Sequence, residues 1–136
     1  MKRIILTSLI LLSVLSGSSF AMDWIIVPGA KTDGDMVCLD RDDVSKRKGV
    51  ITAWLKRFKE GGNYTKTLME FDCSKKQSRT LKSVEFDKPT STTTTIDFEP
   101  VWEVSAPETP ASAATAMICR KGKGINPALV SMKQLP

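Results

Sequence analysis

The sequence predicts an α+β domain in which several β-strands precede one C-terminal α-helix and one disulfide ties the fold. Three observations lead to this prediction. Residues 67–73 alternate between apolar and polar with the period of a strand that has one buried face. The segment that starts at Pro110 carries an apolar stripe at helical spacing. Cys73 ends the alternating segment, and Cys119 lies near the end of the helical one.

The N-terminus has the pattern of a secretory signal peptide. Lys2 and Arg3 precede an apolar run over residues 4–14, and small residues follow up to Ala21. The run is too short to span about 30 Å of hydrocarbon, which argues against a membrane anchor. We therefore expect cleavage of residues 1–21 and export to the periplasm or the medium. No cysteine stands at the processing site, so the sequence offers no lipidation cysteine for surface anchoring.

Composition narrows the classes of function. The chain has 136 residues, with 20 Lys and Arg against 15 Asp and Glu, and it has no histidine. Because the signal peptide removes two positive charges, the remaining domain is only mildly basic, unlike a nucleic-acid-binding protein. The absence of histidine excludes Ser-His-Asp and Cys-His catalysis and histidine-ligated zinc. We expect no cofactor, no metal and no nucleic-acid partner.

Two short strands open the mature domain. Residues 24–28 are apolar on both faces, which favours a buried strand that stops at Pro28 and Gly29. After a turn at residues 33–35, residues 36–40 form the second strand.

An acidic cluster and a basic cluster follow the second strand. Asp40, Asp42 and Asp43 crowd together, but their spacing does not match a calcium-binding loop. Turn and cap chemistry therefore explains them better than a cation site. Residues 45–49 then form a basic turn.

Residues 50–58 fit two structures. Their apolar positions recur at helical spacing, and Gly61 and Gly62 would stop a helix. The β-branched residues and Trp54 suit a strand, and a strand covered on both faces also shows apolar residues on each side. Periodicity alone favours the helix, so the residues leave this segment open.

The centre of the chain predicts a loop, a strand, a turn and a returning strand at residues 61–66, 67–73, 74–78 and 79–87. We place the first of these strands at the centre of the sheet. In a regular returning strand, Leu81 would point opposite to Val84 and Phe86. A β-bulge would bring these apolar residues to one face.

The segment between the hairpin and the helix is less regular. The threonine-rich residues 89–95 fit either a mobile loop or a polar edge strand, and we favour the loop. Trp102 and Val104 predict a short extended piece that enters the core.

The predicted helix has a clear start. Thr109 is a good N-cap, and Pro110 fits the first helical position. Its apolar stripe consists of Ala113, Ala114, Met117 and Ile118. Gly122 would end the helix. The domain then covers residues 22–122, and residues 123–136 form a loosely ordered tail.

The three cysteines allow one intramolecular disulfide and leave one thiol over. A bond between Cys73 and Cys119 would join the central strand to the helix and stabilise the domain by about 4 kcal/mol. Cys38 would then be a small buried apolar residue. Pairing of Cys38 with either of the others, or with another molecule, stays open.

A set of short motifs, in this order along the chain, resembles the surface-adhesin E family of small exported bacterial proteins. The motifs are Leu39-Asp40, Asp43-Val44, Gly49, Trp54, Glu70-Phe71-Asp72-Cys73, Arg79, Trp102 and Val104 with Pro107, and Cys119. The resemblance covers about residues 24–120. It implies one antiparallel sheet of about five to six strands packed against one C-terminal helix, a bond between the two late cysteines, and a strand at residues 50–58.

The resemblance also implies a class of function. Members named for their activity bind host matrix or serum proteins, sometimes as homodimers. No binding motif matches this chain position by position, so the resemblance assigns no binding residue. The sequence therefore predicts an exported, non-catalytic binding protein. The alternative is a periplasmic structural or housekeeping interaction protein with no adhesin role.

Basic turns offer a patch for an anionic or protein partner. The patch consists of Lys46, Arg47, Lys48, Lys75 and Lys76. Lysine and arginine clusters attract sulfated glycans, lipopolysaccharide or acidic protein surfaces. Solvated turn residues that keep the protein soluble would show the same pattern.

A catalytic alternative rests on four carboxylates, Glu70, Asp72, Glu85 and Asp87, on two adjacent predicted strands. Two of them could pair as glycoside hydrolases require. Exposed carboxylates that alternate with lysines on a sheet are the simpler explanation, so we expect no enzyme activity.

Overall fold

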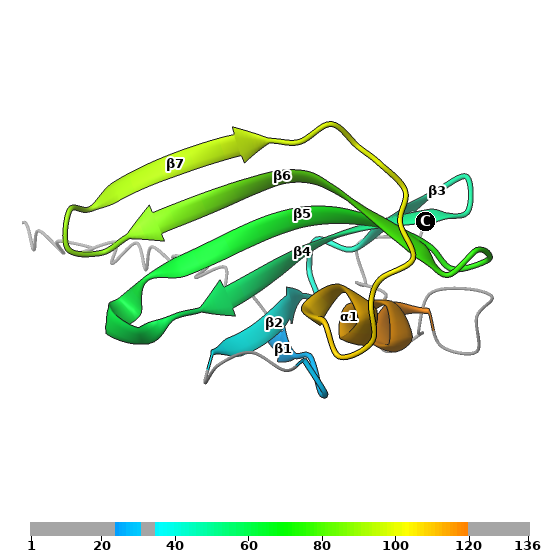
Figure 1. Cartoon of the computed structure of the whole chain (residues 1–136), viewed down its shortest axis with the longest axis horizontal. Helices are drawn as coiled ribbons and strands as arrows, with labels where there is room; N and C mark the ends of the chain where they lie inside the picture. The colour runs from blue at the N-terminus through cyan, green and yellow to red at the C-terminus, as the bar shows by residue number, and fades with distance from the viewer. Residues whose placement is uncertain (1–23, 31–34, 120–136) are drawn as a thin grey trace, which may run out of the picture.

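The computed structural model describes residues 24–30 and 35–119 of the chain. These residues form one antiparallel sheet and one α-helix (Figure 1). The sheet runs in the order β1-β2-β4-β5-β6-β7, with β3 paired to β4 beside this path. The elements are β1 (Trp24–Ile26), β2 (Met36–Asp40), β3 (Ser45–Arg47), β4 (Val50–Phe58), β5 (Tyr64–Asp72), β6 (Gln77–Asp87), β7 (Thr92–Asp97) and α1 (Pro110–Ile118). The predicted fold class is confirmed, and the short β3 brings the sheet to seven strands.

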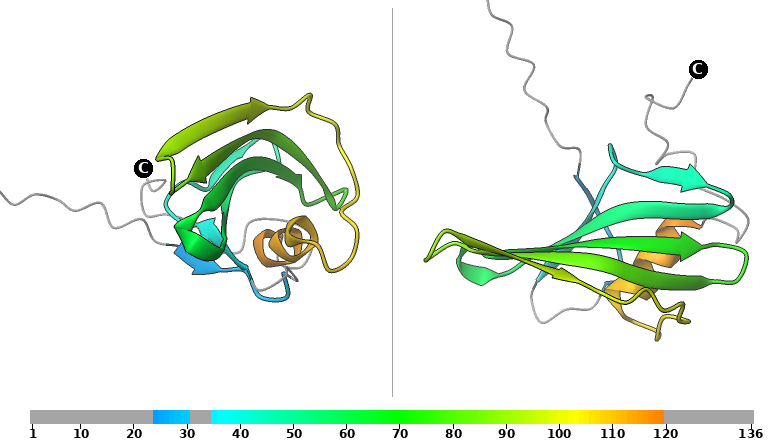
Figure 2. Two further views of the ribbon diagram at one scale, coloured as in Figure 1. Left: turned by 60° about the vertical axis from the view of Figure 1, so that its left-hand side comes forward. Right: turned by 90° about the horizontal axis from the view of Figure 1, so that it is seen from above.

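The sheet curves around α1, which covers one of its two faces (Figure 2). We call the face toward α1 the inner face and the opposite one the outer face. The inner face and α1 bury a shared apolar cluster: Val27, Val37, Leu39, Val44, Ile51, Ala53, Leu55, Met69, Phe71, Cys73, Ala114, Ile118 and Cys119. Burial of this apolar surface is the main driving force for the fold.

Strand β5 lies in the middle of the sheet, as predicted. It pairs with β4 on one side and with β6 on the other. Met69 and Phe71 point inward and are buried, whereas Leu68, Glu70 and Asp72 are half-buried on the outer face. Phe71 is fully buried and is the largest side chain of the core.

Strand β4 settles the segment that the residues left open. Residues 50–58 form a strand in which Ile51, Ala53 and Leu55 are buried and the residues between them are half-buried. The strand reading implied by the family resemblance is confirmed, and the helical reading is wrong. The apolar spacing is misleading because both faces of β4 carry apolar side chains. The strand therefore lacks strict period-two alternation, and its apolar positions recur at intervals that resemble those of a helix.

The C-terminal helix is fixed by its cap and by a disulfide. The Oγ1 atom of Thr109 accepts a hydrogen bond from the backbone N–H of Ser112 at 3.2 Å, and Pro110 opens the helix. Cys119, directly after the last turn, is bonded to Cys73 directly after β5. This confirms the predicted cap and the predicted disulfide. The helix ends at Ile118, ahead of the predicted stop.

The bulge expected in β6 is present. The register between β5 and β6 shifts between Leu68 and Met69, which pair with Lys82 and Thr80. Leu81 is therefore the extra residue. Because of the bulge, Lys82 shares the outer face with Leu68.

Two predictions about strands and turns are wrong in detail. The basic segment 45–49 is not all turn, because Ser45–Arg47 forms β3. Only Lys48 and Gly49 turn the chain, both with positive φ (50° and 83°), as in a two-residue type I′ hairpin. The loop predicted at residues 61–66 is shorter, since β5 already begins at Tyr64.

Two apolar segments are more exposed than predicted. Strand β1 lies at an edge of the sheet, so its Ile26 is 60% exposed instead of buried. Val104 is 72% exposed and does not enter the core. The piece that contains it adds only a single bridge between Glu103 and Ser78 to the sheet.

The threonine-rich segment is an edge strand and not the favoured loop. Thr92–Asp97 forms β7, which pairs with β6 and is exposed throughout. Only residues 88–91 turn the chain. Threonine is β-branched and suits a strand even where its side chain is solvated.

Several predictions fall on residues that the structure does not describe. The signal peptide at residues 1–21, the tail at residues 123–136, the outer limits of the domain and most of the turn at residues 33–35 lie outside the described residues. Within the described part of the chain, no helix is long and apolar enough to cross a membrane.

Candidate functional site

The predicted basic patch lies at one end of the sheet. The register Arg47↔Val50↔Asp72↔Gln77 places the β3–β4 turn and the β5–β6 turn at the same end (Figure 1). Strands β3 and β5 are two strand spacings apart, roughly 10 Å. We call this region the basic end. It consists of Lys46, Arg47, Lys48, Lys75 and Lys76, all of which are exposed.

The cations of the basic end do not share one face. Along β3, Lys46 lies opposite the inward-pointing Ile51, whereas Arg47 lies opposite Val50 on the outer side. Lys48 is at the tip of the hairpin. The basic end is therefore a rim of positive charge around the end of the sheet.

Asp72 fixes the turn that carries Lys75 and Lys76. Its Oδ1 accepts hydrogen bonds from the Ser74 hydroxyl at 2.5 Å, the Ser74 N–H at 3.0 Å and the Lys75 N–H at 3.1 Å. The bond from the Ser74 hydroxyl is the main reason that the pKa of Asp72 lies below its ordinary value of 3.8. The Lys75 Nζ lies 3.8 Å from Asp72 Oδ2, a solvent-exposed ion pair that neutralises one of the five cations in part.

Sequence reasoning missed a second surface, on the outer face of the sheet. It combines three lysines with five aromatic residues and is called here the outer-face array. Its members are Trp24, Trp54, Lys56, Phe58, Tyr64, Lys66, Lys82 and Phe86, all half-buried. The lysines come from β4, β5 and β6, so the array crosses the centre of the sheet.

The ammonium groups of the array lie over aromatic rings. The Lys56 Nζ is 4.0 Å from the ring centroid of Tyr64, 4.5 Å from that of Phe58 and 5.5 Å from that of Trp24. The Lys66 Nζ is 5.3 Å from the centroid of Trp24. These distances are within the range of cation–π attraction.

A second ring links the array to β6. The Lys66 Nζ and the Lys82 Nζ lie 5.3 Å and 5.7 Å from the centroid of Trp54. Farther along the outer side, the Arg79 guanidinium lies 4.5 Å from the centroid of the Trp102 ring. All three tryptophans therefore contact cations on this side, and none belongs to the buried core.

A signal for this array exists in the sequence. At even positions, residues 54–58 read Trp, Lys, Phe and residues 64–66 read Tyr, Lys. With strand period these residues share one face. Local pattern hides this signal, because periodicity alone leaves residues 50–58 open between helix and strand and residues 61–66 predict a loop.

The four carboxylates of the catalytic alternative are not brought together. The Arg79 Nε lies 2.5 Å from Glu70 Oε2, and Asp72 holds the β5–β6 turn. Glu85 pairs in register with Thr65 near the other end of the hairpin, and Asp87 follows it there. The expected explanation as separate surface carboxylates fits better than a catalytic pair.

The acidic cluster after β2 is a turn, as predicted. The Asp42 N–H donates to Asp40 Oδ1 at 3.1 Å. Burial raises the pKa of Asp40, and this hydrogen bond partly opposes the shift. Among the described residues, no group of three or more His, Cys, Asp or Glu side chains could hold a metal ion.

Cys38 is a free thiol and only 3% exposed. Burial raises the pKa of this thiol, and the charge of Lys56 opposes the shift in part. Within the described residues, the prediction of a small buried apolar residue fits this position better than a bridge to another molecule.

Comparison with known proteins gives one result. A family model described as Surface-adhesin protein E matches residues 24–120 of the chain. The match covers every described strand and the helix. No curated protein and no solved structure matches the chain.

Proposed function

Because the chain belongs to the Surface-adhesin protein E family, we propose that it is an exported, non-catalytic protein that binds host matrix or serum proteins through its basic end. One observation carries the choice of surface. The basic residues 46–48 of the β3–β4 hairpin and the basic residues 75–76 of the β5–β6 turn lie at the same end of the sheet, with every cation exposed. A concentrated positive rim accelerates and orients contact with an acidic protein surface.

The non-catalytic part of the proposal has separate support. Membership of an adhesin family points to a protein without enzyme activity. The carboxylates that could have formed a catalytic pair are spread over both ends of the β5–β6 hairpin.

Export is the second part of the proposal. The family points to an exported protein, and the first residues have the pattern of a signal peptide. We expect the mature chain to begin at Met22 and its folded domain to cover residues 22–122. N-terminal sequencing of the protein recovered from the periplasm and from the medium checks both the cleavage and the compartment.

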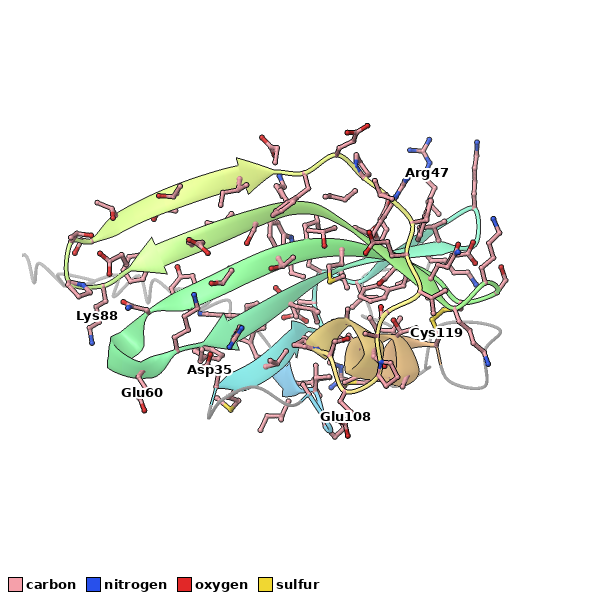
Figure 3. All side chains as sticks on the ribbon, viewed as in Figure 1. Asp35, Arg47, Glu60, Lys88, Glu108 and Cys119 are labelled. Carbon is pink, nitrogen blue, oxygen red and sulfur yellow. A yellow bond between two sulfur atoms is a disulfide. The ribbon has the colours of Figure 1, made fainter. Side chains whose placement is uncertain are left out.

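A binding measurement on matched variants tests the surface. The oxidised mature protein is immobilised and titrated with purified matrix and serum proteins at physiological salt. Lys46→Ala with Lys48→Ala removes two charges from the basic end. Lys59→Ala with Lys88→Ala removes two exposed charges from the opposite end, where Figure 3 labels Lys88.

We expect the basic-end variant to weaken binding about tenfold and the control variant to leave it nearly unchanged. Equal weakening by both variants would reduce the effect to net charge and contradict a local site. Capture of periplasmic proteins alone, with no binding to the matrix and serum panel, would favour the housekeeping interaction role instead.

A further inference from the structure

We propose that the outer-face array is a second binding site, and that its ligand is a sulfated polysaccharide. The site is distinct from the basic end and does not depend on the proposed contact with host proteins. It lies on the sheet surface that faces away from α1, where β4, β5 and β6 run side by side (Figure 2).

The three lysines of the array lie on adjacent strands as neighbours, so their positive charges repel one another. Lys56 and Lys66 are direct cross-strand partners, and Lys82 is the diagonal neighbour of Lys66 on β6. Like charges directly opposite each other destabilise a sheet. Burial, and after it the charge of Lys66, lowers the pKa of Lys56. An anion bound between these ammonium groups would relieve the repulsion.

No salt bridge joins the three cations to a carboxylate in the described part of the chain, although Asp97 of β7 is the cross-strand partner of Lys82. The salt bridges among the described residues join Arg57 to Asp35, Lys75 to Asp72 and Arg79 to Glu70. None of them includes a lysine of the array. Asp40 is the acidic group that feels the charge of Lys66. Its side chain is buried, and its carboxylate accepts the Asp42 N–H, so it is committed to the turn.

The aromatic rings hold the cations in place before any ligand arrives. The Trp24 ring is within cation–π distance of both Lys56 and Lys66, and the Trp54 ring is within that distance of both Lys66 and Lys82. Lysine side chains are otherwise among the most mobile, and ordering them costs binding free energy. Prior placement over rings lowers that cost for an anionic ligand.

The same arrangement selects the class of ligand. Single-stranded nucleic acids bind aromatic residues by stacking bases on free ring faces. Here ammonium groups already lie over the rings of Trp24, Trp54 and Tyr64, so the main new contact is between anions and ammonium groups.

The spacing of the lysines favours a linear chain with dense charge. Direct cross-strand neighbours are about 5 Å apart at Cβ and diagonal neighbours about 7–8 Å. Sulfate groups repeat closely along a sulfated polysaccharide and can bridge such neighbours across three strands. An open sheet face also suits an extended chain better than a compact small molecule.

Tryptophan fluorescence provides a direct test, because all three tryptophans contact cations on the outer side of the sheet. The oxidised mature protein is titrated with a heparin-derived oligosaccharide, with uncharged dextran and with single-stranded DNA of matched charge. We expect a saturable change with the sulfated sugar, none with dextran, and clearly weaker binding of DNA.

Two charge-matched triple variants locate the site. Lys56→Gln, Lys66→Gln and Lys82→Gln together remove three cations from the array. Lys46→Gln, Lys48→Gln and Lys75→Gln remove three from the basic end. We expect the first variant to weaken the sulfated oligosaccharide about tenfold or more, and the second by less than about threefold. Urea unfolding of both variants verifies that each is folded.

Three results would overturn the proposal. They are an unchanged affinity in the array variant, an equal loss in both variants, and equal or tighter binding of DNA than of the sulfated sugar. Host-protein binding by the array variant separates this proposal from the proposed function. Retained host-protein binding with lost sugar binding supports two sites, whereas the reverse result contradicts the assignment of the sugar to the array.

Discussion

The two faces of the central strands have opposite compositions although the same residues 50–72 form both. On the inner face, Ile51, Leu55 and Phe71 are buried against α1. On the outer face, the neighbouring positions carry the outer-face array of lysines and aromatic rings. The largest apolar side chains, the tryptophans, are thus absent from the core. The core depends on aliphatic residues and one phenylalanine.

This difference shows how period-two alternation assigns separate roles within one strand. Apolar burial stabilises the inner face. The outer face opposes like charges across strands, which has a cost in stability that a purely structural surface would avoid. We interpret the inner face as the source of stability and the outer face as a surface kept for binding. The following predictions test this division.

The disulfide should give the largest effect on the inner side. Replacing both Cys73 and Cys119 with serine removes a bond that closes a sequence separation of 46 residues. We expect the free energy of unfolding, measured by urea denaturation, to fall by about 4 kcal/mol. A loss below about 1 kcal/mol would mean that the bond does not hold the helix to the sheet.

Two neighbouring residues on β4 compare the faces directly. Ile51→Ala deletes a fully buried side chain, and we expect it to lower the free energy of unfolding by about 3 kcal/mol. Thr52→Ala, on the outer side, should change it by about 0.5 kcal/mol or less. Similar losses in the two variants would remove the distinction between the faces.

The contribution of Lys56 to the stability of the folded state should increase as pH rises. A lysine whose charged form is stabilised by folding would show the opposite trend. Its pKa is lowered from 10.5 by burial and then by Lys66, so its charged form is disfavoured in the folded state. That penalty is complete below the folded pKa and is relieved as pH rises from there toward 10.5. Relative to Lys56→Gln, the wild-type protein should gain stability over this window. A wild-type protein that loses stability there, relative to the variant, would contradict the desolvated state of Lys56.

Asp72 should give the smallest effect, at acid pH. Its folded pKa lies below 3.8, mainly because of the Ser74 hydroxyl, so its contribution is present above 3.8 and is lost as pH falls through the folded value. Asp72→Asn should therefore be slightly less stable than wild type at pH 7, and the difference should disappear in strong acid. Acid titration of the unfolding midpoint measures it, and a constant difference would exclude the carboxylate as the cause.

Most of the fold was predictable because its strongest local signals agree with its tertiary contacts. Three such signals appear in the structure as expected: the alternation at residues 67–73, the Thr109 cap and the disulfide between Cys73 and Cys119. Each of these features is set by nearby residues or by a covalent bond. Local sequence is therefore sufficient to identify them.

The local pattern is ambiguous or misleading where the identity of a neighbouring strand decides the outcome. Residues 50–58 look helical until β2, β3 and β5 are known to flank them. The exposure of Ile26 and the strand at Thr92–Asp97 both follow from positions at the sheet edges. Strands that pair can be far apart in the sequence, so the hydrophobic pattern of one segment alone does not identify its neighbours in the sheet.

The candidate sites were predictable to different extents. The basic end consists of two charged segments, which the local sequence reveals, although their common location follows only from strand register. The outer-face array depends on side chains from four strands, one of which, β6, changes face at a bulge. A reader of the sequence would need that bulge to place Lys82 beside Trp54.

The central claim, that the outer face serves binding and not stability, is tested most directly by one unfolding measurement. The variant that combines Lys56→Gln, Lys66→Gln and Lys82→Gln is denatured in urea beside the wild type. We expect its free energy of unfolding to stay within about 1 kcal/mol of the wild-type value, because the relieved repulsion and the lost cation–π attraction oppose each other. A loss of about 3 kcal/mol, as expected for Ile51→Ala, would make the outer face a structural element and contradict the claim.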